Sequence, residues 1–204
     1  MYSFRGFLLL AVGLVLFIGM SSCANAPKIT RTDAAEQIDL SGNWNDTDSQ
    51  LVSTAMVGEA LTMPWVNDYK ASNGRKPTVI VGNVRNKSHE HINTETFIKD
   101  LERALINSGK VTFVASSEQR AEIRQERIEQ AQHASMETAK SAGMESGADF
   151  MLKGQINTIM DEAGKTSLKY YQIELELISI TNNEKVWMGQ KKIKKIVQKK
   201  KRRL

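Results

Sequence analysis

Three consecutive stretches in the last third of the chain have the residue pattern of β-strands, and they limit the folds that this sequence can adopt. In the middle stretch apolar residues alternate with polar ones: Tyr171, Ile173, Leu175 and Leu177 are separated by Gln172, Glu174 and Glu176. The stretches Phe150–Met160 and Lys185–Ile193 precede and follow it, with turns at Asp161–Lys165 and Thr181–Glu184. Such alternation is typical of antiparallel strands with one buried face. We therefore expect a meander whose apolar face is covered by helices.

The chain ahead of this meander alternates between helical and strand patterns. A capping box, Thr47-x-x-Gln50, predicts a helix over Thr47–Leu61. The apolar, β-branched run Thr78–Val84 is typical of a central strand covered on both faces. Thr94–Ser108 carries an apolar stripe at helical spacing and is followed by Gly109, a residue type that often ends helices.

Two further elements complete this part of the chain. Val111–Ala115 predicts a second short strand, and the capping box Ser116-x-x-Gln119 predicts a long charged helix that runs to about Ala142. The inner stripe of that helix is made mostly of small residues, which predicts close packing on the sheet: Ala121, Ile128, Ser135, Ala139 and Ala142. The expected order is α-β-α-β-α-β-β-β. It predicts an α/β fold with a single small domain, a mixed four- to five-stranded sheet and helices mainly on one face.

The only cysteine, Cys23, lies directly behind a hydrophobic N-terminal segment. Arg5 and the apolar run Phe7–Met20 are typical of a signal peptide, and the run is shorter than the roughly 20 apolar residues of a membrane span. The segment Met20-Ser21-Ser22-Cys23 resembles a bacterial lipobox, with Met20 in place of the usual leucine. The resemblance implies that Cys23 is lipidated after residues 1–22 are removed. An ordinary signal peptide with an incidental cysteine is the alternative.

The composition divides the remaining chain into three parts. Residues 23–46 are polar and have no amphipathic period, which predicts a flexible, lipid-anchored tether. A globular domain is expected over residues 47–197 and a basic C-terminal tail over residues 198–204. No second cysteine is present, so no disulfide within the chain can stabilise the domain. The net charge of +5 reflects the C-terminus, because residues 23–190 hold 18 basic residues against 23 acidic ones.

No motif in the sequence supports an enzyme, a metal site or a cofactor. The segment Ala163–Ser167 (AGKTS) resembles the end of a phosphate-binding loop, but Ile159 stands where that motif needs a glycine, and a strand pattern follows. His89-Glu90-His91 supplies two imidazoles without a third ligand nearby, which favours a solvated loop. Glu174 and Glu176 share one side of a strand whose other side is apolar, which indicates a solvent-facing surface rather than an acid–base pair. We expect no catalytic residue, no metal, no cofactor and no small-molecule substrate.

The basic run Lys191–Arg203 has two interpretations. In a cytosolic chain it would indicate nucleic acid, but the expected export of this protein argues against that partner. One interpretation is a strand end that continues into a solvated tail. The other is attraction to anionic envelope material such as phospholipid head groups, lipopolysaccharide phosphates or cell-wall carboxylates.

Several stretches of the sequence resemble the penicillin-binding protein activator LpoB family. They are Asp39–Asp48 (DLSGNWNDTD), Gly74–Ser88 (GRKPTVIVGNVRNKS), Phe97–Lys110 (FIKDLERALINSGK), Gly147–Gly154 (GADFMLKG) and Glu184–Trp187 (EKVW). Together with the lipobox, the resemblance extends over nearly the whole mature chain to about Ile196. Two features depart from the family pattern: the tether is short, and the basic tail lies outside it.

The resemblance implies a small α/β domain similar to the N-terminal domain of TolB. It also implies a non-enzymatic lipoprotein of the outer membrane that faces the periplasm and stimulates a bifunctional penicillin-binding protein, the peptidoglycan synthase of cell-wall synthesis. Ala24 supports the outer membrane, because the resemblance to enterobacterial lipoproteins associates inner-membrane retention with aspartate at that position. The alternative functions are a structural component of an envelope assembly or secretion complex, and a wall-binding module.

The contact with the synthase is expected directly after the strand Thr78–Val84. Arg85, Asn86, Lys87 and Ser88 are similar to the family yet polar, and we interpret them as a loop in which packing does not explain the residues. They are the predicted partner-binding residues.

Overall fold

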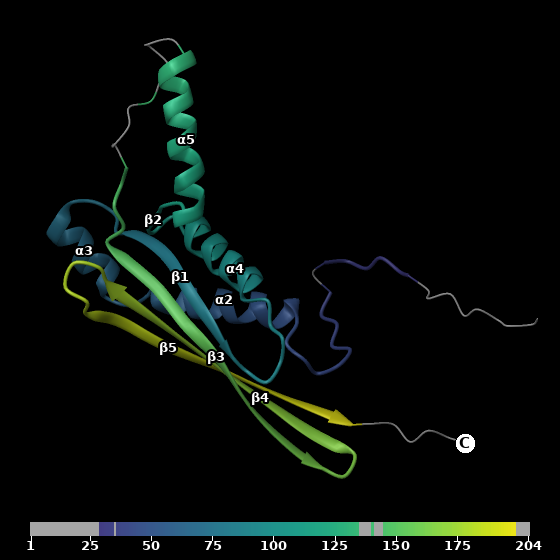
Figure 1. Cartoon of the computed structure of the whole chain (residues 1–204). Helices are drawn as coiled ribbons and strands as arrows, with labels where there is room; N and C mark the ends of the chain where they lie inside the picture. The colour runs from purple at the N-terminus through teal and green to yellow at the C-terminus, as the bar shows by residue number, and fades with distance from the viewer. Residues whose placement is uncertain (1–28, 35, 135–139, 141–144, 199–204) are drawn as a thin grey trace, which may run out of the picture. The chain divides into compact units, whose positions relative to one another are not determined.

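The computed structural model describes residues 29–34, 36–134, 140 and 145–198 (Figure 1). Residues up to Glu36 and residues from Gln37 onward form separate units, and the described part of the first contains no helix or strand. The predicted signal peptide, Cys23 and the tail beyond Gln198 lie outside the described residues. Within the described ranges, none of the helices combines the length and apolarity that a membrane crossing requires.

The second unit is built on a five-stranded mixed sheet in the order β2-β1-β3-β4-β5 (Figure 1). The strands are β1 (Thr78–Lys87), β2 (Thr112–Phe113), β3 (Phe150–Ala163), β4 (Thr166–Ser179) and β5 (Lys185–Gln198). β1 runs parallel to β2 and β3, and β4 runs antiparallel to both of its neighbours. The predicted meander of the last three strands is confirmed.

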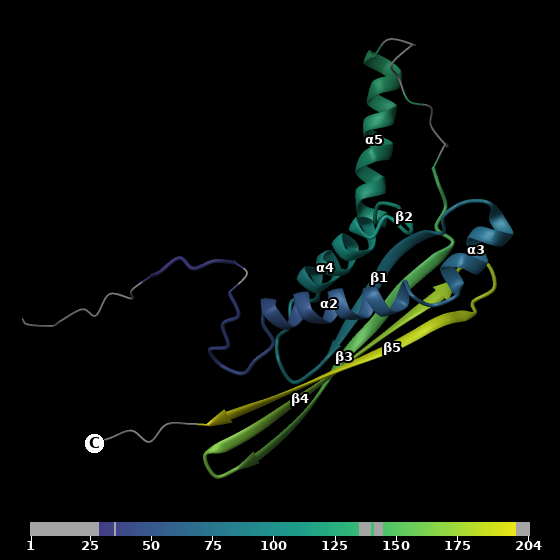
Figure 2. The same cartoon turned by 180° about the vertical axis from the view of Figure 1, so that it is seen from behind.

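Two helices, α2 (Asp46–Ala60) and α4 (Thr94–Asn107), cover one face of this sheet (Figure 2). The buried side chains between helices and sheet are large and apolar: Val52, Met56 and Val57 of α2, Phe97, Leu101 and Leu105 of α4, and Val79, Val81, Leu152, Ile156, Tyr171, Ile173, Leu175 and Leu177 of the strands. Every second residue of β4 from Tyr171 to Leu177 is buried, as the alternation predicts.

The first helix begins one residue before the predicted start, and a different capping box holds it. Asn45 is the N-cap: its side chain accepts a hydrogen bond from the backbone N–H of Asp48, and the Asp48 carboxylate accepts one from the N–H of Asn45. The prediction from Thr47 and Gln50 was therefore wrong, because Asn and Asp form the same reciprocal pair two residues earlier.

A helix that the sequence does not predict, α3 (Trp65–Asn73), follows Pro64. Its aromatic residues contact β3: Trp65 and Tyr69 lie edge-on to Phe150, with ring centroids 5.1 and 5.4 Å away, and Val66 is also buried. The helix ends at Gly74, whose φ of 68° is the left-handed conformation that glycine adopts readily. The observed order is therefore α-α-β-α-β-α-β-β-β.

The parallel strands also differ from the prediction. β1 continues three residues beyond Val84, and only one of its faces is fully buried, whereas coverage on both faces was predicted. β2 comprises only Thr112 and Phe113 of the predicted Val111–Ala115.

The long charged helix α5 (Ser117–His133) starts at the predicted capping box, where Ser116 and Gln119 bond reciprocally. Its predicted packing was wrong: no residue of α5 is buried, Ala121 is exposed and Ile128 is 50% exposed. In Figures 1 and 2 the helix rises away from the sheet. Of the rest of the predicted stripe, Ser135, Ala139 and Ala142 lie outside the described residues.

The antiparallel strands are longer than predicted. The turn between β3 and β4 consists of Gly164 and Lys165 alone, and β5 extends through the basic segment to Gln198. The fold class is confirmed: one α/β domain with a mixed five-stranded sheet and its packed helices on one face.

Candidate partner-binding face

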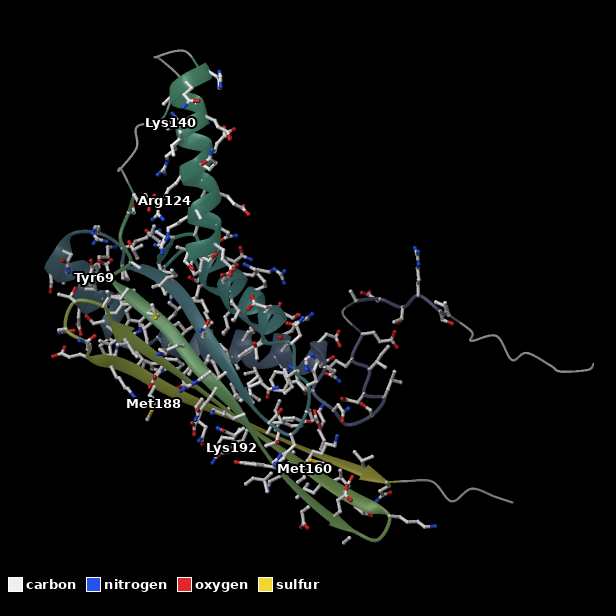
Figure 3. The ribbon with its side chains drawn as sticks, in the orientation of Figure 1. Tyr69, Arg124, Lys140, Met160, Met188 and Lys192 are labelled. Atoms are coloured by element: carbon white, nitrogen blue, oxygen red, sulfur yellow. The ribbon has the colours of Figure 1, made fainter. Side chains whose placement is uncertain are left out.

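The sheet face opposite α2 and α4 has no helix packed on it within the described residues, and we call it the open face (Figure 3). Strand register places its side chains in rows across the sheet. One row runs Arg85, Gln155, Glu174, Gln190, and the next runs Lys87, Asn157, Gln172, Lys192. Figure 3 labels Met188 and Lys192 along β5 on this face.

A shallow groove of about 320 Å³ crosses the open face, with charged residues of four strands along it. Its lining includes Arg85, Lys153, Gln155, Glu174, Glu176, Lys185 and Met188. Both carboxylates in the groove already have partners. Gln155 and Gln172 donate to Glu174 at 2.9 and 2.6 Å, and Lys185 pairs with Glu176 at 2.5 Å.

The groove and the neighbouring Lys87 carry an excess of positive charge, because Arg85, Lys87, Lys153 and Lys185 outnumber the carboxylates Glu174 and Glu176. The hydrogen bonds from Gln155 and Gln172 hold the pKa of Glu174 below its usual value, so this carboxylate stays ionised. Arg85, Lys87 and Lys153 make no ion pair with any residue that the structure describes. Three cations without a neutralising carboxylate therefore lie on the open face, and an acidic segment of another protein fits that charge.

The structure separates the four predicted contact residues into two pairs. All but Ser88 belong to β1 rather than to a loop, so the loop prediction was wrong. Arg85 and Lys87 are exposed on the open face, whereas Asn86 and Ser88 both donate side-chain hydrogen bonds to the carbonyl of Glu90, at 2.8 and 3.0 Å. Asn86 and Ser88 thus have a structural explanation, because they shape the bend after β1.

On the covered side of the sheet, Glu90 is the centre of a polar cluster. Its carboxylate accepts from the Tyr171 hydroxyl at 2.8 Å, from Lys169 at 2.7 Å and from the Trp44 backbone N–H at 3.1 Å. Burial alone would raise the pKa of Glu90, but the bonds from Lys169 and Tyr171 outweigh it and the pKa lies below its usual value. The flanking His89 and His91 are exposed, and His89 bonds Thr158. No trio of His, Cys, Asp or Glu in the described ranges is placed to hold a metal.

This cluster fixes residues 39–45 to the domain, and we call them the entry segment. Lys195 of β5 donates to Asp39 at 2.7 Å, to Asp48 at 2.6 Å and to the Asn43 carbonyl at 3.1 Å. The Trp44 ring lies edge-on to Phe97 and Tyr171. The polar composition of residues 23–46 predicts a tether, but in the structure residues 39–45 are packed against the domain.

Gly42 allows the entry segment to lie directly on the end of β5. Its φ is 70°, and a Cβ built there would stand 2.3 Å from a methyl carbon of Val197. No other residue type fits without displacement. This contact gives a physical reason for the glycine in the family-like stretch Asp39–Asp48.

Arg75 and Asp149, which lie in two of the stretches that resemble the family, hold the start of β1 beside the start of β3. Arg75 donates two hydrogen bonds to Asp149, both at 2.8 Å, and the Thr78 backbone N–H donates a third at 2.7 Å. Burial would raise the pKa of Asp149, but these donors lower it to about 2. The residues are structural, since they join two parallel strands.

Sequence reasoning missed two sets of residues. Lys153 and Gln155 could have been assigned to the open face from strand alternation, because they fall on the polar side of β3. Lys185 could not, because it alternates with the buried Trp187 and reaches the open face only through a register shift between Leu177 and Ile178. Lys169 and Lys195 fall on the apolar side, and no local pattern shows that carboxylates from the entry segment and the bend after β1 meet them there. The phosphate-loop-like residues Ala163–Ser167 form the hairpin turn, as interpreted.

Comparison with known proteins gives one family match. A family model for the peptidoglycan-synthase activator LpoB matches residues 48–193. No curated protein matches the sequence. The matched range runs from the first turn of α2 into β5 and includes the open face.

Solved structures of LpoB are among those that resemble this chain. The LpoB C-terminal domain from Salmonella enterica is 19% identical, with 74% of this chain and 99% of that chain covered and a TM-score of 0.40. The corresponding domain from Escherichia coli is 16% identical over 72% and 98% of the two chains, with a TM-score of 0.41. The NMR structure of E. coli LpoB is 17% identical over 88% and 85%, with a TM-score of 0.42.

Proposed function

This chain belongs to the family of the peptidoglycan-synthase activator LpoB, and on that premise we propose that it binds a bifunctional penicillin-binding protein and raises its activity. The family is one of regulators rather than enzymes. Beyond family membership, we propose a bifunctional penicillin-binding protein as the partner, the open face as the contact surface and Cys23 as the lipid anchor.

The observation that carries the proposed contact is the set of unpaired cations on the open face. Arg85, Lys87 and Lys153 come from adjacent strands, and a rigid sheet holds them in fixed register. We place the synthase on this face, with its own acidic groups against these cations. Asn86 and Ser88 contribute by holding the bend after β1 rather than by touching the partner.

Activation on this proposal is allosteric. A bound regulator raises the synthase's activity only if it has higher affinity for the active state, and a tenfold shift needs about 1.4 kcal/mol of differential affinity. Weak docking suffices when both proteins are held in one compartment, because tethering raises their effective concentration.

The proposed anchor is Cys23 of the lipobox-like segment. Lipid on Cys23 would hold the protein on the outer membrane, facing the periplasm, with the residues before Asp39 as the tether. Acyl chains contribute about 0.8 kcal/mol per buried CH₂, so several chains give a lasting attachment.

The test is glycan polymerisation by the host's bifunctional synthases from lipid-linked precursor, with residues 24–204 added. Acceleration of one synthase and not of others would support the proposal and identify the partner. If the folded protein neither binds nor accelerates any of them, the activator function is refuted for this chain, and a structural role in an envelope assembly would be tested next.

The contact is tested with R85A/K87A, which removes two exposed cations of the open face. We expect about tenfold weaker binding to the synthase, with a reduced salt dependence, because charges at an interface mainly guide association. The matched control is K70A/K140A, which removes two exposed lysines that lie outside the open face. Unchanged affinity of R85A/K87A would remove the open face from the proposal.

A further inference from the structure

We propose that the far end of the sheet binds the surface of an anionic phospholipid membrane, independently of the synthase. The binding surface consists of Ile159, Leu168, Tyr170, Lys192, Lys194 and Ile196, which we call the hairpin patch. It lies where the strands extend beyond α2 and α4 (Figure 1), and Figure 3 labels Lys192 and Met160 in this part of the sheet.

Strand register brings the apolar residues of the patch onto one face. Ile159 lies opposite Tyr170, and Tyr170 opposite Lys194; in the next row Leu168 lies opposite Ile196. Ile159 and Ile196 are 65% and 68% exposed. Because the apolar residues of the patch occupy adjacent positions on neighbouring strands, they form a continuous apolar surface, and exposed surfaces of that kind mark interaction sites.

Basic residues surround these apolar groups. Lys192 and Lys194 are exposed on the same face, and Lys194 Nζ lies 5.8 Å from the centre of the Tyr170 ring. Asp161 shares a row with Leu168 and Ile196 and is the acidic residue of this row. The sequence beyond Gln198 continues directly into five basic residues, Lys199–Arg203. The sequence therefore adds five positive charges directly after β5.

Aliphatic side chains, a tyrosine and lysines on one surface fit the membrane interface. Isoleucine and leucine enter the acyl boundary, tyrosine sits at the level of the head groups, and lysines face anionic phosphate. An acidic polymer of the wall would engage the lysines but offer nothing to Ile159 and Ile196. The mixed chemistry of the patch therefore favours phospholipid.

The patch also lies at the end of the domain where the chain enters. Lys195 of β5 holds Asp39 and the carbonyl of Asn43, on the opposite side of the same strand end. Cys23 is sixteen residues before Asp39, a stretch that reaches at most roughly 55 Å. A lipid anchor on Cys23 would thus keep the patch within reach of the same membrane.

The experiment is co-sedimentation of residues 24–204 with vesicles, because this chain keeps every described residue and lacks the acyl group that would mask weak binding. We expect binding to phosphatidylcholine vesicles that contain phosphatidylglycerol and none to pure phosphatidylcholine. Binding should fall steeply in about 1 M salt, where the Debye length is about 3 Å.

Two variants separate the contributions of the patch and the tail. I159S/I196S should lower the partition coefficient at least about fivefold, because two apolar side chains no longer enter the interface. A chain that ends at Gln198 should lower it at least about tenfold, since five basic residues are lost. The matched control is I123S/I128S on α5, where 42% and 50% exposed isoleucines lie outside the patch and binding should be unchanged.

The proposal is overturned if the wild type does not bind anionic vesicles, or if I159S/I196S binds as well as the wild type, which would assign binding to the tail alone. Circular dichroism checks that each variant is folded, and K192Q/K194Q tests the patch again without touching apolar residues. Synthase binding distinguishes this proposal from the proposed function. R85A/K87A should bind the synthase more weakly and bind vesicles like the wild type. I159S/I196S should bind the synthase like the wild type and bind vesicles more weakly. If I159S/I196S instead loses affinity for the synthase, the patch belongs to the protein partner and the membrane proposal is overturned.

Discussion

Arg85, Asn86, Lys87 and Ser88 are consecutive, yet their side chains serve two different purposes. The pleat of β1 sends Arg85 and Lys87 to the open face, while Asn86 and Ser88 bond the carbonyl of Glu90. The sequence predicts a loop here because four polar residues have no apolar alternation. A strand whose ends project beyond the helical layer has the same composition, so residue type alone could not separate the proposed contact residues from structural ones.

Asp149 links the start of β3 to the start of β1 through its carboxylate, which bonds Arg75 and the Thr78 N–H. We expect D149N to lower the free energy of unfolding by about 1–2 kcal/mol at pH 7, because the lowered pKa of Asp149 favours the folded state and the half-exposed Arg75 is partly screened by solvent. The folded pKa is about 2 and the ordinary value is 3.8. The stabilisation is therefore complete above the ordinary value and is lost as the pH falls through the folded one.

Urea unfolding of the wild type and D149N at several pH values measures this. The difference should be constant from pH 7 to about pH 5 and shrink between about pH 4 and pH 2. D161N, at an exposed carboxylate of the hairpin, is the control and should stay within about 0.5 kcal/mol of the wild type. A difference for D149N that does not depend on pH would mean that packing, and not charge, holds the two strands.

At the scale of elements, the packing of α4, which has a stripe of large apolar residues, was predicted correctly, and the packing of α5, which has a stripe of small residues, was not. Phe97, Leu101 and Leu105 of α4 are buried as expected, because such side chains must be covered. The packing predicted from the alanines of α5 was wrong, since alanine favours a helix whether or not the helix is covered. The helix α3 was missed because its packing depends on two aromatic rings that meet Phe150, a residue distant in sequence.

The two helices should differ sharply in their sensitivity to substitution. L101A in α4 should cost about 2–5 kcal/mol of unfolding free energy, because Leu101 is fully buried in the core. I128A in α5 removes a comparable side chain and should change it by less than about 0.5 kcal/mol. Thermal and urea unfolding compare the two; a loss above about 1 kcal/mol in I128A would show that α5 packs against the domain in solution.

At the scale of the whole molecule, the packed unit begins with the entry segment, ahead of the α2 helix. The fold class follows from the sequence because strand alternation and helix stripes are local patterns. The attachment of residues 39–45 does not, since it depends on Lys169, Lys195 and Glu90 meeting residues far away in the chain. The composition of residues 39–45, polar and with a glycine, predicts a flexible tether, because it does not show the distant residues that they contact.

Two truncations test where the folded unit begins. A chain that starts at Gln37 should unfold at the same urea concentration as residues 24–204, because it keeps every contact of the entry segment. A chain that starts at Thr47 should lose at least about 3 kcal/mol, since it removes the helix cap and the Trp44 packing and leaves Lys195 with one carboxylate instead of two. Equal midpoints for all three chains would place residues 39–45 in the tether after all.

The attachment of the entry segment also has a mechanical consequence. With the proposed lipid on Cys23, tension between the membrane and the domain would reach Asp39 and Lys195 before it reaches α2, because the pulled chain meets β5 first. Release of residues 39–45 would lengthen the connection by about 25 Å while the sheet and its helices stay folded. On the proposed attachment, residues 39–45 would therefore act as a short extensible segment that is released before the sheet unfolds.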